Sequence, residues 1–145
     1  MLHTLQKLES QGFEVTLLDV HENGVVTAEE VKAALRDDTC LVTVMYANNE
    51  IGTVQPIAEI GAVCRERGVL FHTDAIQAAG HLPIDVTAQN LDLPSLSAHK
   101  IHGPKGAGVL YTKSGVSLSS LIAGGAQERG KRAGNKNTPG IRGMA

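Results

Sequence analysis

The chain has 145 residues, a formal net charge of −2, 42% apolar residues and 19% charged residues. A chain of this length suits one domain with its own core. The near-neutral charge, with Lys131-Arg132 as the only adjacent basic pair, disfavours binding to nucleic acid or to an anionic membrane surface. No apolar run approaches the ~20 residues that span a bilayer, so a cytoplasmic location is expected.

The chain contains two cysteines, Cys40 and Cys64. Two are too few for a disulfide framework or a zinc ribbon. Cys40 precedes an apolar run, and Cys64 shares a helical face with Ile57 and Ile60. Both are therefore predicted to be buried and to act as small hydrophobic residues.

The first elements are predicted to alternate between helix and strand. Leucines recur at near-helical spacing over residues 2–8, and Gly12 suits the end of that helix. Residues 13–20 are predicted to form a strand. Residues 27–30 have the pattern of a capping box, which predicts a short helix that ends near Arg36.

The central part of the chain continues this alternation. The apolar run 41–45 predicts a strand, Pro56 begins a helix that Gly68 ends, and residues 69–73 predict the next strand. Two further short apolar runs, the second predicted to be antiparallel because a tight Gly-rich loop precedes it, cover residues 91–96 and 108–112. Apolar strands separated by amphipathic helices indicate a three-layer α/β fold with a mostly parallel sheet, covered on both faces.

Polar clusters follow three of the predicted strands. They are residues 48–50, Asp74 with Gln77, and Ser97 with His99 and Lys100. Because functional sites in such folds gather at the carboxyl ends of the strands, these clusters are expected to converge at one edge of the sheet.

Lys100 is the most informative member of these clusters. A neutral lysine amine forms a Schiff base with an aldehyde cofactor, and partial desolvation or a neighbouring cation favours the neutral form. The Ser97 hydroxyl and the N–H groups of the turn 103–106 are natural phosphate donors. Asp74 suits either a helix cap or a partner for a protonated heterocyclic nitrogen. Read alone, the same segment is also compatible with an ordinary polar loop.

Two other kinds of site are disfavoured. His72, His99 and His102 with Asp74 lack the spacing of a helical metal motif, so no metal is predicted. The turn 103–106 lacks the spacing and the Ser or Thr of a Walker phosphate loop.

Four ordered motifs, at residues 47–56, 71–77, 97–106 and 125–134, closely resemble those of the NifS/IscS-type cysteine desulfurases. These enzymes belong to the class V, fold-type I family that uses pyridoxal 5'-phosphate. The resemblance implies that residues 1–113 are part of the large cofactor domain. It also implies that residues 114–145, rich in Ser and Gly and then basic, continue that domain towards a dimer interface.

The resemblance also implies a role for each motif residue. Lys100 corresponds to the lysine that forms the Schiff base, and Lys105 to a structural residue of the following turn. The other implied cofactor contacts are Asp74 to the pyridine nitrogen, Gln77 and Asn49 near the ring oxygen, and Ser97 and His99 to the phosphate. Asn135 stands where the family usually has a threonine that reaches the phosphate across the dimer, so it is a candidate cross-subunit contact.

The implied activity removes sulfur from L-cysteine, giving alanine and an enzyme persulfide, in a homodimer that serves a sulfur-acceptor protein in iron-sulfur cluster assembly. Family members are more than twice as long as this chain, and neither Cys40 nor Cys64 matches the sulfur-accepting position. The chain thus resembles an internal fragment that is expected to be inactive alone. Alternatives are a selenocysteine lyase or another class V enzyme, and a non-catalytic remnant or partner-completed module. An exposed sheet edge would favour self-association.

Overall fold

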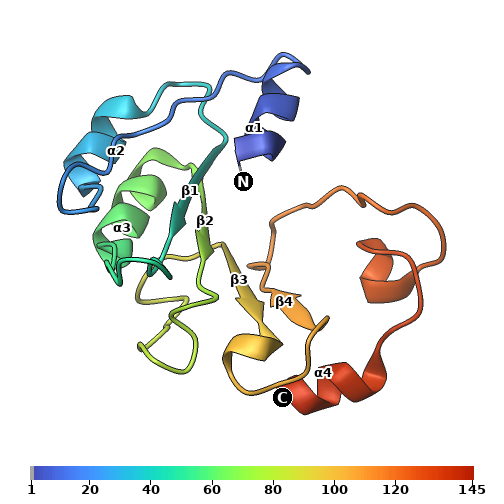
Figure 1. The fold of residues 1–145 in the computed structure, drawn as a ribbon. Coiled ribbons are helices and arrows are strands. Elements are labelled where there is room, and N and C mark those ends of the chain that lie inside the picture. Colours follow the sequence, from blue (N-terminus) through green and yellow to red (C-terminus); the bar gives the residue numbers. More distant parts are fainter. Residues whose placement is uncertain (1) are drawn as a thin grey trace.

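The computed structural model describes residues 2–145 as an α/β fold around a four-stranded sheet (Figure 1). The strands are β1 (Leu41–Met45), β2 (Leu70–Asp74), β3 (Leu93–Ser97) and β4 (Gly108–Leu110), in that order across the sheet. β1, β2 and β3 are parallel, whereas β4 is antiparallel to β3. The α-helices are α1 (Leu2–Glu9), α2 (Ala28–Ala34), α3 (Ile57–Arg67) and α4 (Thr138–Met144). The predicted α/β class, the mostly parallel sheet and the antiparallel last strand are confirmed.

The core lies between the sheet and α3. Phe71 of β2 and Ile60 of α3 are fully buried, and α2 packs on α3 (Figure 1). Cys64 is buried as predicted, and this burial raises the pKa of its thiol to about 11. Cys40 is exposed, so its predicted burial is wrong. It directly precedes β1, whose outer edge has no neighbouring strand among residues 2–145.

Gly61 brings α3 close to the loop before β3. A Cβ atom at this position would lie 2.1 Å from the backbone carbonyl oxygen of Gln89. Helix propensity alone predicts that Gly61→Ala stabilises the chain and that Ala62→Gly destabilises it, each by about 1 kcal/mol. We expect Gly61→Ala to destabilise the chain instead, because a backbone carbonyl cannot move aside as a flexible side chain can.

Urea unfolding of these two variants checks the expectation. Ala62 is exposed on the same helix and reports propensity without the close approach. An increase in the free energy of unfolding for Gly61→Ala would contradict the role given to this contact.

Helix α2 begins with the predicted capping box. The Thr27 hydroxyl accepts from the Glu30 N–H at 3.2 Å, and the Glu30 carboxylate accepts from the Thr27 N–H at 2.8 Å. The His21 side chain also bonds to the Glu30 carboxylate. The helix ends at Ala34, because Leu35 is extended and Thr39 Oγ1 accepts the Arg36 N–H.

These contacts predict a pH dependence. The Thr27 N–H, followed by the His21 side chain, lowers the pKa of Glu30 from 4.5 to about 2. This stabilisation is therefore complete above pH 4.5 and is lost as the pH falls through about 2. The Glu30 bond raises the pKa of His21 above 6.5, so that contribution is present below pH 6.5 and is lost at higher pH.

A carboxyl NMR titration measures the Glu30 pKa directly. We expect His21→Ala and Thr27→Ala each to move it part of the way back towards 4.5. An intact chain in which Glu30 titrates at 4.5 would rule the capping network out.

Residues 13–20 do not form the predicted strand. They pair with no strand among residues 2–145, and Phe13, Leu17 and Val20 are exposed by 48–67%. An apolar cleft of about 880 Å³, here called the edge cleft, separates this segment and α1 from the unpaired edge of β1. The total accessible surface is 9649 Å², whereas a sealed monomer of this mass has about 7,100 Å². The alternating pattern is strand-like, but the hydrogen bonds of a strand require a neighbour.

The other predicted boundaries shift by one or two residues. β2 includes Asp74, β3 begins at Leu93, and Pro56 is the residue before α3 rather than its first residue. Within residues 2–145, α3 is the helix that packs extensively on the sheet, and it does so against β2. No helix of the described chain is both long and apolar enough to cross a membrane.

Residues 114–145 contain a short 3₁₀-helix (Gln127–Gly130) and α4, and no strand. After β4 they form a long loop that extends away from the sheet (Figure 1). At its end, Gly143 of α4 lies next to Pro104. The division of the chain at residue 113 stays a prediction.

Candidate functional site

The carboxyl ends of β1, β2 and β3 meet around a small pocket, as the polar clusters predict. This strand-end pocket has a volume of about 230 Å³. Its lining residues come from the ends of the first two strands, the loops after them and the 3₁₀-helix (Ala98–Lys100) that follows β3; they are Met45, Asn49, Asp74, Ile76, Gln77 and Lys100. Four of the six are candidate residues from the sequence.

Asp74 is the last residue of β2 and is half-buried. One carboxylate oxygen accepts the Ile76 N–H at 3.0 Å, so Asp74 caps a turn rather than a helix. Its backbone is held on both sides, because its carbonyl accepts the Tyr46 N–H at 2.8 Å and the next N–H donates to Ser95. No cation pairs with Asp74 in the part of the chain that the structure describes. A carboxylate is thus presented to the pocket with its charge unpaired.

Lys100 ends the 3₁₀-helix and is exposed. The loop behind it is tied back, because Ile101 and Gly103 both donate their N–H groups to the Ala98 carbonyl. Lys105 is also exposed but does not line the pocket. Of the two lysines that the sequence offered, the fold therefore brings Lys100 to Asp74.

Two amide side chains complete the polar lining. Asn49 is exposed and donates to the Glu50 carboxylate at 2.9 Å. Asn48 shapes this loop, because its side-chain oxygen accepts the N–H groups of Glu50 and Ile51. Gln77 is half-buried in the loop after β2. Residues 48–52 form a turn, in which the Gly52 N–H donates to the Asn48 carbonyl, and this turn brings Asn49 to the pocket.

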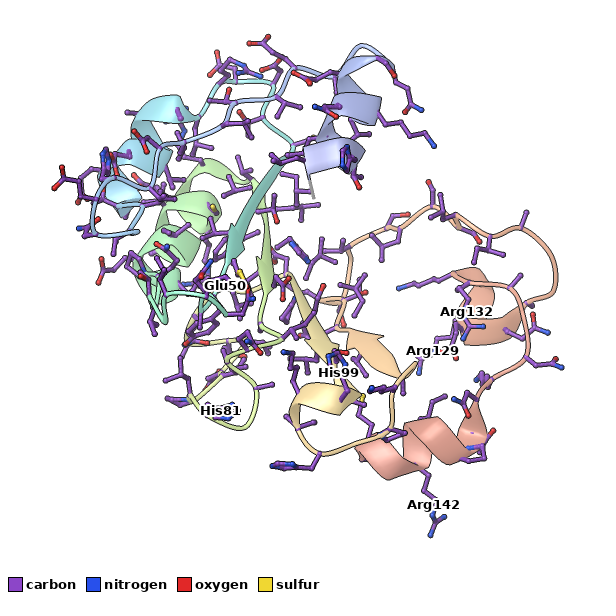
Figure 2. All side chains as sticks on the ribbon, viewed as in Figure 1. Glu50, His81, His99, Arg129, Arg132 and Arg142 are labelled. Atoms are coloured by element: carbon purple, nitrogen blue, oxygen red, sulfur yellow. The ribbon has the colours of Figure 1, made fainter. Side chains whose placement is uncertain are left out.

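The candidate phosphate contacts lie outside this lining. Ser97 Oγ is 2.8 Å from His99 Nδ1, so the two form a pair beside the pocket. Asn135 is exposed in the carboxy-terminal segment, where Figure 2 also places Arg129 and Arg132, away from Glu50. Among residues 2–145, no three His, Cys, Asp or Glu side chains are grouped to hold a metal.

Two lining residues were missed by the sequence reasoning, Met45 and Ile76. Both are apolar, whereas the sequence pattern gave roles at the site to polar side chains. The signal that could have found them is their position, since Met45 ends β1 and pairs in register with Asp74.

The chain is similar to known proteins over almost its whole length. A family model described as aminotransferase class-V matches residues 1–144. The chain is 58% identical over 144 residues to the cysteine desulfurase IscS of Clostridium botulinum strain Hall, covering 99% of this chain and 36% of that protein. It is 60% identical to the putative cysteine desulfurase IscS 1 of Bacillus subtilis strain 168, of which it covers 38%.

Solved structures that resemble the chain agree with these sequence comparisons. A structure described as SspA in complex with cysteine superposes with a TM-score of 0.96 at 48% identity, covering 99% of this chain and 42% of that one. A NifS-like protein superposes with a TM-score of 0.93 at 43% identity and 40% coverage of that chain. The chain thus spans little more than a third of the length of the curated relatives it matches.

Proposed function

Because the chain belongs to the aminotransferase class-V family, we propose that it supplies part of the cofactor domain of a pyridoxal-phosphate-dependent cysteine desulfurase acting on L-cysteine. The observation that carries this proposal is the strand-end pocket, where the unpaired carboxylate of Asp74 and the amine of Lys100 face one small space. Identity of 56–60% to several IscS proteins supports the choice of substrate.

The residues present fit pyridoxal phosphate. An aldehyde needs an amine, a protonated ring nitrogen needs a carboxylate, and a ring oxygen needs a donor; Lys100, Asp74 and the amides of Asn49 and Gln77 offer these groups. Ser97 and His99 would hold the phosphate, with Asn135 of a second subunit as a further contact. When bound, the cofactor withdraws electrons from the α-carbon of the amino acid.

The roles of this chain's own residues follow from their positions. Lys100 would hold the aldehyde carbon covalently and, once released, would carry the α-proton at its Nζ. Asp74 would keep the ring nitrogen protonated, since its charge is not spent on another cation. Asn49 and Gln77 would orient the ring between the loops after β1 and β2.

Sulfur acceptance is not provided by these residues. Cys64 is buried and its pKa is raised to about 11, which leaves little thiolate at neutral pH. Cys40 lines the edge cleft and not the strand-end pocket. The persulfide-forming thiol, the acceptor protein for iron-sulfur assembly and the homodimer therefore belong to the longer protein that the relatives represent, for which a cytoplasmic location is also proposed.

Addition of pyridoxal phosphate to the purified chain, reduction with borohydride and peptide mapping test the proposal. We expect a visible absorption band and a stoichiometric label on Lys100. Label scattered over Lys105 and surface lysines, with no band, would show that these residues do not form a cofactor site in this chain.

A further inference from the structure

A hydrogen-bonded row of side chains crosses the sheet directly behind the strand-end pocket. His72 of β2 lies between two hydroxyls: its Nδ1 is 2.7 Å from Thr43 Oγ1 on β1, and its Nε2 is 2.8 Å from Ser95 Oγ on β3. All three side chains are half-buried. This row, here called the cross-strand clamp, joins the three parallel strands on the face that does not carry Phe71.

The clamp residues lie on the same face of their strands as the residues at the site. Side chains two residues apart point to the same face of a strand. Two residues after Thr43, His72 and Ser95 stand Met45, Asp74 and Ser97, respectively. The first two line the pocket, and the third is the candidate phosphate donor. Each strand therefore carries a clamp residue two positions before a residue at the site, with both side chains on the same face of the sheet.

Strand pairing between β2 and β3 is shorter than pairing between β1 and β2. Pairing of β1 with β2 runs from Leu41 to Met45, but pairing of β2 with β3 covers three residues and ends at Asp74 with Ser95. Asp74 thus sits at the last paired position of β2, where its carbonyl and the next N–H are bonded but its side chain is fixed by the backbone only through the Ile76 N–H. The bond between His72, two positions before Asp74 on the same face, and Ser95, the register partner of Asp74, adds a side-chain link that restricts shear between β2 and β3.

Packing alone does not account for the three polar residues. Apolar side chains of the same shape fill such a position at little or no cost in stability, whereas half-buried polar groups must all be paired. The imidazole has two ring nitrogens and here each meets one hydroxyl. Burial lowers the pKa of His72, which keeps the ring neutral and able both to donate and to accept.

We propose that the cross-strand clamp positions Asp74 for the ring nitrogen of the cofactor, with His72 as a positioning residue rather than a catalytic one. This inference rests on the proposed function. In this proposal His72 does not contact the cofactor, because it does not line the pocket. It acts by holding the strand that carries Asp74.

Five substitutions test the clamp. Thr43→Val and Ser95→Ala each remove one hydroxyl, Thr43→Ser keeps it, and His72→Phe removes both bonds. Thr39→Val is the matched control, because Thr39 Oγ1 also accepts a hydrogen bond but lies outside the pocket. We expect the Kd for pyridoxal phosphate, followed by the visible band, to rise about tenfold for each lost hydroxyl. The Kd should be unchanged in Thr43→Ser and Thr39→Val.

A second readout needs no cofactor. In the amide NMR spectrum of the chain alone, Thr43→Val and Ser95→Ala should shift the resonances of Asp74 and Ile76, whose N–H donates to the Asp74 carboxylate. Thr43→Ser should leave them in place.

The two readouts separate the clamp from the cofactor site. If the unaltered chain binds cofactor and the Thr43→Val and Ser95→Ala variants bind it equally well, the clamp is wrong and the proposed function stands. If the unaltered chain binds none, the proposed function fails for this chain and the amide shifts alone decide. Unmoved Asp74 and Ile76 resonances then overturn the clamp, and moved ones support it. Circular dichroism confirms that each variant compared is folded.

Discussion

Lys100→Ala is expected to abolish the covalent cofactor adduct completely. The pocket places one lysine amine opposite Asp74, and alanine leaves no nucleophile for the aldehyde. Absorption spectroscopy after addition of pyridoxal phosphate, followed by borohydride reduction and mass spectrometry, measures this loss. Noncovalent binding through the other pocket residues should persist with lower affinity.

Lys105→Ala is the matched control. Lys105 lies five residues further along, is exposed like Lys100 and does not line the pocket. It should leave both the band and the labelled peptide unchanged. A specific adduct that survives Lys100→Ala, or that disappears in Lys105→Ala, would reverse the assignment of the two lysines.

Phe71→Ala is expected to cost about 3–5 kcal/mol of the free energy of unfolding. Phe71 is fully buried at the centre of the sheet, and its N–H also donates to the buried Asp92 carboxylate at 3.0 Å. Small domains have a total stability of roughly 5–15 kcal/mol, so this loss would remove a large fraction of the stability of the chain. Urea unfolding followed by circular dichroism gives the value.

Phe13→Ala provides the comparison within the same chain. Phe13 is 54% exposed beside the edge cleft, so the same truncation removes far less buried surface and leaves no closed cavity. Its effect should be under about 1 kcal/mol. Equal losses for the two phenylalanines would mean that the core is not centred on β2.

The sequence predicted those parts of the structure that depend on local pattern and on the geometry of parallel sheets. The run 41–45 became β1 with its predicted bounds, and the rule of strand ends brought Asn49, Asp74, Gln77 and Lys100 to one pocket. Asp74 itself was placed just after a strand and proved to be its last residue. Strand ends depend on the partner strand, which local composition does not specify.

The failures share one physical cause, which is dependence on a distant neighbour. Residues 13–20 have the composition of a strand but lack a partner, and Cys40 has apolar neighbours in sequence but an open edge beside it in space. The hydrogen bonds of His72 belong to the same class, because Thr43 and Ser95 are 29 and 23 residues away. In each case the local sequence shows the residue types, but the neighbours that decide the outcome are distant in sequence and come near only in the folded chain.

The edge cleft also sets how this chain should respond to denaturant and to heat. The m-value and the heat capacity change of unfolding both scale with the surface that unfolding newly exposes. Since the native chain already exposes Leu17, Val20 and Leu41 beside the cleft, less remains to be exposed. Its unfolding transition should therefore be broad, and its stability curve flatter than that of a sealed domain of 145 residues.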